Sequence, residues 1–235
     1  MSNFQMPQHV IDRVMEKRGR LNVFDSFEPA KTAFLVIDMQ NFFVNGVQPC
    51  LDVMPNINRL AGKVRDAGGL VVWVVLTVAE TEDGPSLWPI YHDNFFTEQK
   101  MKAHKAGLTR GSEGHAIHEN LDVHDVDLIS EKTRFSALVQ GASDLHEQLQ
   151  ARGIENLLVG GTLTNMCCES TARDAMMIGY KVIMVEDCNA SRNDEDHAVG
   201  LTSVFQSFSD VRSTDDVIDN VLGLGRRLPR RNNRQ

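Results

Sequence analysis

Three side chains of complementary chemistry follow apolar segments of the sequence: Asp38, Lys132 and Cys167. A cysteine attacks a carbonyl carbon once a base has taken its proton, and a carboxylate can take that proton and later return it to a leaving group. A lysine can stabilise the thiolate and keep the carboxylate ionised. We expect Cys167 to lie in the first turn of a helix, where the dipole and free N–H groups would lower the thiol pKa toward neutral. The alternatives at this point are a buried ion pair and a structural cysteine.

The elements that must position these side chains can be inferred from hydrophobic patterning. Apolar runs rich in β-branched residues predict strands at 32–39, 70–77, 126–131, 156–161, 181–187 and 210–213. Apolar residues at helical spacing predict helices at 57–67, 138–149, 167–178, 198–205 and 217–221. This alternation predicts an α/β fold with three α-β-α layers around a six-stranded, mostly parallel, Rossmann-like sheet. Because ligands bind at the carboxyl ends of parallel strands, the three side chains are expected to meet there.

Three further segments set the expected domain organisation. We expect a single catalytic domain over 31–222, preceded by an N-terminal arm, 1–30, with a short amphipathic stretch. The arginine-rich segment 223–235 is expected to be a disordered basic tail. Residues 78–125 form a long insertion, rich in aromatic residues and glycine, that is expected to wall a pocket.

Composition narrows the class of partner. The chain of 235 residues carries a net charge of −8, which disfavours nucleic acid as a partner. Its apolar runs are far shorter than the roughly 20 residues of a membrane span, and its start does not read as a secretory signal. The four cysteines show no CxxC spacing, which predicts free thiols in a reducing cytoplasm rather than disulfides or zinc. A dinucleotide site is disfavoured because no G-x-G-x-x-G follows any strand.

Three segments, LVIDMQNFF, EKTRFSAL and GGTLTNMCCESTARDAMMIGYKVIMVEDC, resemble the signature segments of the isochorismatase-like cysteine hydrolases over residues 31–212. The resemblance implies that Asp38, Lys132 and Cys167 are the catalytic triad. It also implies a cis peptide bond between Thr162 and Leu163, with the Leu163 and Cys167 amides forming an oxyanion hole. The family commonly forms dimers or tetramers, so a homodimer or homotetramer is expected.

The predicted activity is hydrolysis of a C–N bond in a small amide, ureido or carbamoyl compound through a thioester, without a cofactor. Gln40, Phe43 and Trp88 are the expected substrate-binding residues. Nicotinamidases in this family bind a metal through histidines after the second strand; the matching stretch LTVAETEDGPSLW has none, so neither a metal nor nicotinamidase activity is expected. The CCEST segment is closer to the carbamoyl and ureido amidohydrolases. The alternatives are an isochorismate-type vinyl ether hydrolase and a redox-sensing or binding protein on the same fold.

Overall fold

A computed structural model describes residues 4–225 of the chain, and its centre is one parallel β-sheet. The six strands are β1 (Thr32–Ile37), β2 (Leu70–Leu76), β3 (Leu128–Lys132), β4 (Asn156–Thr162), β5 (Lys181–Ala190) and β6 (Asp210–Arg212). Every neighbouring pair is parallel, in the order β3-β2-β1-β4-β5-β6. All six predicted strands and the α/β fold class are confirmed.

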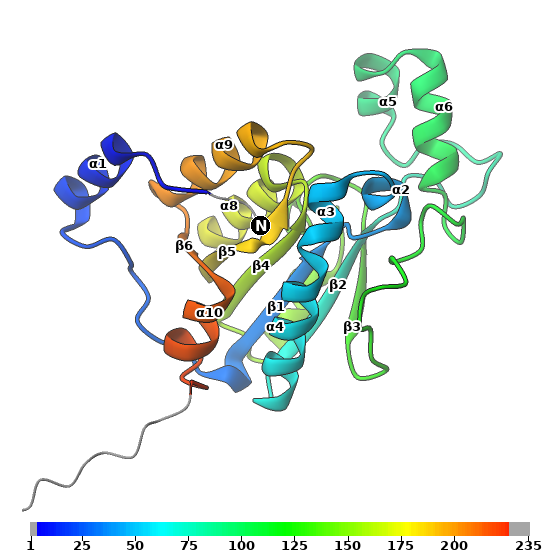
Figure 1. The fold of residues 1–235 in the computed structure, drawn as a ribbon. Coiled ribbons are helices and arrows are strands. Elements are labelled where there is room, and N and C mark those ends of the chain that lie inside the picture. Colours follow the sequence, from blue (N-terminus) through cyan, green and yellow to red (C-terminus); the bar gives the residue numbers. More distant parts are fainter. Residues whose placement is uncertain (1–3, 226–235) are drawn as a thin grey trace, which may run out of the picture.

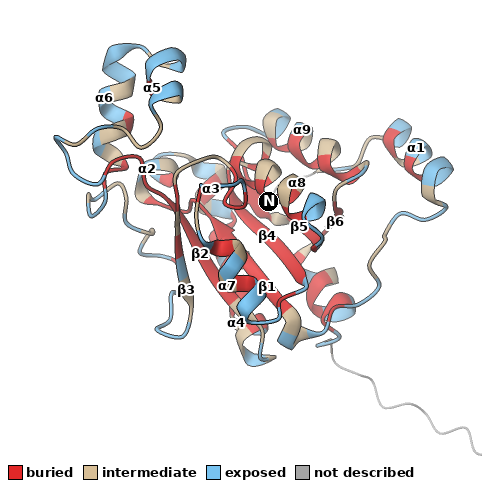
Figure 2. Cartoon of the chain, turned by 180° about the vertical axis from the view of Figure 1, so that it is seen from behind, coloured by how far each residue is buried: buried red, intermediate tan, exposed pale blue. Residues whose placement is uncertain are grey.

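Both faces of the sheet are buried, which explains why the strands have almost continuously apolar sequences. Phe34 and Val36 of β1 belong to one core, which also includes residues of α4 (Met54–Asp66) and the C-terminal turns. Ala33, Leu35 and Ile37 point to the opposite core. That second core is covered by α7 (Leu145–Ala151), α8 (Glu169–Met177) and α9 (Asp194–Phe205). Figures 1 and 2 show the two helical layers from opposite sides.

The helices agree with the predicted periodicity except at their ends. The predicted helix 138–149 is too long: α7 begins only at Leu145, because residues up to Asp144 form turns that include Gly141 at φ 78°. Helix α9 begins earlier than predicted, because the side chain of Asn193 caps it by accepting from the Asp196 amide. The predicted C-terminal helix is present as α10 (Thr214–Asp216), capped by Ser213, followed by a π-helical turn, η3 (Val217–Val221).

Short helices flank the carboxyl end of the sheet. After β1 the chain forms α2 (Asn41–Val44) and α3 (Gln48–Asp52). The insertion after β2 contains α5 (Pro89–Phe95) and α6 (Glu98–Gly107), two helices that stand apart from the rest of the fold in Figure 1. The middle of the insertion is thus a pair of helices, and residues 108–125 after it have no helix.

The N-terminal arm packs on its own chain. Helix α1 (Gln8–Arg18) buries Val10 and Val14 against Phe205 of α9, and Lys17 Nζ donates to Ser207 Oγ at 2.8 Å. A short 3₁₀ turn, η1 (Pro29–Lys31), leads into β1. Of the predicted basic tail, residues 226–235 lie outside the described part of the chain. Between residues 4 and 225, no helix has the length and apolar character needed to cross a membrane.

Candidate active site

Asp38 and Lys132 form a fully buried ion pair at the carboxyl ends of β1 and β3. Lys132 Nζ lies 2.8 Å from Asp38 Oδ2 and donates a second hydrogen bond, of 3.0 Å, to the carbonyl of Arg134. Asp38 directly follows β1 in a left-handed conformation at φ 51°, which is uncommon outside glycine. Its other oxygen, Oδ1, is buried without a hydrogen-bond partner among the described residues. One carboxylate oxygen is therefore fixed by the lysine and the other is available as a proton acceptor.

Cys167 lies next to this pair, on a π-helical turn, η2 (Thr164–Cys168), between β4 and α8. Helix α9 contacts this turn, because Thr164 Oγ1 and His197 Nδ1 lie 2.8 Å apart. Gly200 lies so close to the turn that a Cβ on it would come within 2.8 Å of the Asn165 Cα. The structure thus brings the carboxylate, the ammonium and the thiol together, although 94 residues separate Asp38 from Lys132.

The three groups shift one another's pKa. Burial raises the pKa of the Cys167 thiol and the Asp38 carboxylate raises it further, while Lys132 opposes both effects. The prediction of a lowered thiol pKa is therefore wrong, because the loss of hydration and the Asp38 charge outweigh the effect of Lys132. Burial also raises the pKa of Asp38. Burial acts to lower the pKa of Lys132, but Asp38 and Cys167 outweigh it and the net pKa is raised. The resting site thus holds a neutral thiol beside an ion pair whose carboxylate is more basic than usual.

The peptide bond between Thr162 and Leu163 is cis, at the position that the sequence resemblance implies. Thr162 Oγ1 lies 3.3 Å from the sulfur of Cys50, which anchors this end of β4 to α3. Gly161 precedes the bond at φ 115°, and a Cβ there would collide with the backbone of Ile37. Only glycine allows β4 to approach β1 this closely where Cys167 must reach Asp38.

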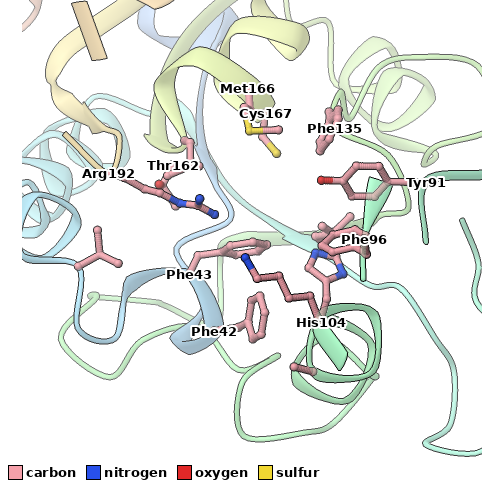
Figure 3. A pocket seen from close by; sticks show the side chains of 15 residues that line it. Phe42, Phe43, Tyr91, Phe96, His104, Phe135, Thr162, Met166, Cys167 and Arg192 are labelled. Carbon is pink, nitrogen blue, oxygen red and sulfur yellow. The ribbon is translucent and has the colours of Figure 1, made fainter. Parts of the chain in front are cut away.

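A cavity of about 380 Å³ opens onto Cys167 (Figure 3). Phe43 from α2 lines it, as predicted, and so do Thr162 and Leu163. The insertion supplies Tyr91, Phe96, Lys100, Ala103 and His104, so its predicted place as a pocket wall is confirmed. Met166 and Phe135 complete the part of the wall nearest the sulfur in Figure 3.

Two predicted substrate-binding residues lie elsewhere. Gln40 is completely buried and its amide is used by the backbone: Nε2 donates to the carbonyls of Leu76 and His115, and Oε1 accepts from the Leu76 amide. It therefore ties β1 to β2 and the insertion and does not line the cavity. Trp88 lies one layer behind the wall, with its ring centroid 4.5 Å from that of Tyr91. It supports the cavity without lining it.

The lining residues that sequence reasoning did not assign to the site include Tyr91, His104 and Arg192. Arg192 follows β5, which runs to Ala190 rather than ending at 187, so a correct strand end would have identified it. Tyr91 and His104 lie on α5 and α6, and nothing in their spacing indicates a site. Among residues 4–225, no group of three or more metal-ligating side chains is placed to hold a metal ion.

Comparison with known proteins gives a consistent set of relatives. Residues 32–216 match the model of the Isochorismatase domain. The ureidoacrylate amidohydrolase RutB of Klebsiella pneumoniae subsp. pneumoniae is 30% identical over 180 residues, covering 69% of this chain and 74% of the relative. An uncharacterized isochorismatase family protein of Bacillus subtilis, YwoC, is 26% identical over 197 residues, covering 81% and 94%.

Solved structures agree on the architecture. A cysteine hydrolase from Pseudomonas syringae pv. phaseolicola superposes with a TM-score of 0.71 at 26% identity, covering 85% of this chain and 97% of the other. The nicotinamidase PncA of Bacillus subtilis gives 0.63 at 26% identity, covering 78% and 100%. N-carbamoylsarcosine amidase from Thermoplasma acidophilum, at 23% identity and a TM-score of 0.62, covers 79% and 97% and shares the fold.

Proposed function

The chain belongs to the isochorismatase family of hydrolases, and on that premise we propose that it is a cysteine-dependent amidohydrolase acting on a small amide, ureido or carbamoyl compound. The proposal rests on one observation: Cys167, which lines a cavity, is buried next to the Asp38–Lys132 ion pair. The 30% identical relative named as a ureidoacrylate amidohydrolase supports the ureido branch of this substrate class.

The proposed reaction uses one proton acceptor twice. Asp38 takes the thiol proton as the Cys167 sulfur attacks the substrate carbonyl, and Lys132 stabilises the negative charge that passes between them. The tetrahedral oxyanion accepts from the Leu163 and Cys167 amides. Asp38 then gives the proton to the leaving nitrogen, and the C–N bond breaks to leave a thioester. Water, deprotonated by Asp38, cleaves the thioester, and the proton returns to the sulfur.

The raised thiol pKa supports this sequence of steps over permanent thiolate chemistry. A resting thiolate needs no base, whereas a neutral thiol needs the basic carboxylate that burial provides in Asp38. The same property disfavours the redox-sensing alternative, because oxidation by peroxide follows thiolate character and exposure. Cys167 is only 6% exposed.

Arg192 narrows the substrate class further. Arg192 is an exposed residue whose guanidinium points toward the cavity in Figure 3, and it makes no hydrogen bond or ion pair with residues 4–225. Lys100 adds a second cation to the lining. A substrate with a carboxylate distal to the scissile bond could pair with this guanidinium. N-carbamoyl and ureido acids have this form.

An ammonia-release screen over neutral amides, N-carbamoyl amino acids and ureido acids tests the proposal. We expect turnover of at least one class, and a loss of about 10³-fold or more in Cys167→Ser. Cys188→Ser is the matched control, since Cys188 is equally buried but hydrogen-bonds to Thr214 at 3.2 Å and does not line the cavity. Ammonia release that survives in Cys167→Ser would overturn the proposal. Pyruvate release from isochorismate without any amidase activity would favour the vinyl ether hydrolase.

A further inference from the structure

Two buried histidines lie next to each other at the cavity, and one of them, His104, lines it. His92 Nε2 on α5 and His104 Nδ1 on α6 are 2.9 Å apart, and the two residues are 2% and 9% exposed. Burial lowers the pKa of His92, and it lowers the pKa of His104 to about 4, with the neighbouring His92 lowering it further. Both rings are therefore neutral near pH 7, and the bond between them holds a single proton.

The surroundings of the pair decide which ring donates that proton. His92 Nδ1 is sealed from solvent and has no hydrogen-bond partner among the described residues. If His104 were the donor, His92 Nδ1 would have to carry a buried, unpaired N–H, whereas with His92 as donor Nδ1 is only a bare acceptor. Buried N–H groups without a partner are the rarer of the two in proteins. His92 therefore donates through Nε2, and His104 accepts through Nδ1.

This tautomer leaves the proton of His104 on Nε2. His104 lines the cavity, and its Nε2 has no hydrogen-bond partner in the described residues 4–225 and is not sealed off as His92 Nδ1 is. The neutral ring thus presents one hydrogen-bond donor to the cavity. Figure 3 shows it beside Phe96, on the side of the cavity opposite Met166 and Cys167. Because the donor lies on the side of the cavity opposite Cys167, it suits the distal part of a substrate.

Aromatic rings enclose this donor. The ring centroid of His104 lies 4.9 Å from that of Phe96, 5.4 Å from that of Phe42 and 6.1 Å from that of Tyr91. Phe43 and Phe135 add two more ring surfaces to the cavity. Such a lining favours a flat apolar group with edge-to-face or offset contacts over a short linear chain.

We propose that the substrate's non-reacting part is a flat apolar ring bearing a hydrogen-bond acceptor, and that His104, oriented by His92, selects it by donating from Nε2. The proposal rests on the proposed amidohydrolase function and deepens it. His104 is a specificity-determining residue in this assignment, and His92 is a positioning residue because it acts only by fixing the tautomer of its neighbour.

The tautomer is measured directly by ¹⁵N chemical shifts of the histidine rings in the full-length protein at pH 7. We expect an unprotonated Nδ1 and a protonated Nε2 on His104. In His92→Phe the partner of Nδ1 is lost, so His104 should become a mixture of tautomers. A His104 ring protonated on Nδ1 in the unmodified protein would overturn the assignment, whatever reaction the enzyme catalyses.

Selectivity is measured with two substrates of equal shape that share the scissile group and the carboxylate: N-carbamoyl-O-methyltyrosine, which carries an ether acceptor, and N-carbamoyl-4-ethylphenylalanine, which does not. We expect kcat/KM to favour the ether by about tenfold, the worth of one hydrogen bond. His104→Phe should abolish this preference, His104→Gln should restore part of it, and the exposed control His124→Phe should keep it. N-carbamoylglycine, which has no ring, should react more slowly than either.

Binding of the two ring substrates to Cys167→Ala tests recognition separately from catalysis, because binding requires no turnover. Calorimetry should show the same preference for the ether over the ethyl compound. Equal affinities for the two, or a preference that persists in His104→Phe, would overturn the inference while leaving the amidohydrolase proposal intact. No turnover of any amide with the binding preference preserved would overturn the proposed function and leave the recognition intact.

Discussion

Lys132 Nζ lies 2.8 Å from Asp38 Oδ2 although β3 and β1, the strands that carry them, are not neighbours in the sheet. Strand β2 lies between them, so the lysine side chain extends across its carboxyl end. Both side chains are almost completely buried. The pair therefore joins three strands at the edge where the cavity opens.

Removing one member of this pair should cost more than removing both. In Lys132→Met the Asp38 charge is left buried without a partner, and we expect the free energy of unfolding to fall by about 3–5 kcal/mol. The double variant Asp38→Asn/Lys132→Met should recover most of that stability but no activity. Urea unfolding and ammonia release measure the two quantities. A double variant less stable than Lys132→Met would contradict this account of the pair.

The acid limb of the pH–activity profile should lie above the ordinary carboxyl range. Asp38 must be ionised to accept the thiol proton, and burial raises its pKa. Activity should therefore fall as pH drops through a midpoint higher than about 4, the value of a free carboxyl. His104→Phe should leave the midpoint of kcat unchanged. A midpoint at or below the free value would argue against Asp38 as the base.

Stability should also fall in acid because of His104. Its folded-state pKa is about 4, below the usual 6.5. The folded state thus binds fewer protons than the unfolded chain. The free energy of unfolding is therefore highest above pH 6.5 and falls as the pH drops toward 4. The shift corresponds to about 3 kcal/mol. His104→Phe should show a correspondingly flatter dependence of unfolding free energy on pH over this window. An unchanged dependence would contradict the lowered pKa of His104.

Gly161 and Gly179 offer a matched test of backbone packing. Both have positive φ, at 115° and 106°, but a Cβ on Gly161 would collide with Ile37 whereas one on Gly179 meets nothing within 4 Å. Gly179→Ala should cost only the backbone strain, about 1–2 kcal/mol. Gly161→Ala should cost clearly more and should reduce kcat, because β4 must move away from β1. Equal costs in chemical denaturation would show that the approach of β4 to β1 is not tight.

Arg192 should act on binding rather than on the chemical step. In Arg192→Gln we expect KM for carboxylate-bearing substrates to rise about tenfold with little change in kcat, and no change for a neutral amide. Arg152→Gln is the control, since Arg152 is exposed at the end of α7 and far from the cavity lining. A rise in KM for neutral and anionic substrates alike would point to a change in cavity shape instead.

The assembly into a homodimer or homotetramer and the cytoplasmic location stay predictions. Measurement of the solution mass by light scattering would decide the first. Within the single chain, α1 packs against Phe205 and both faces of the sheet are covered.

The sequence by itself determined the strands, the fold class and the three residues that the structure brings together as the candidate site. Strands buried on both faces have unbroken apolar runs, and strand ends in a parallel sheet meet at one edge, so Asp38, Lys132 and Cys167 could be assigned from local pattern and topology. The tertiary structure alone decided the direction of the Cys167 pKa shift and the lining of the cavity. A pKa depends on the water that packing excludes. His104 and Arg192 line one cavity only because α6 and the end of β5 converge there. Gln40 is the opposite case. The sequence suggested that it binds substrate, and only three-dimensional packing shows that its amide bonds to the backbone instead.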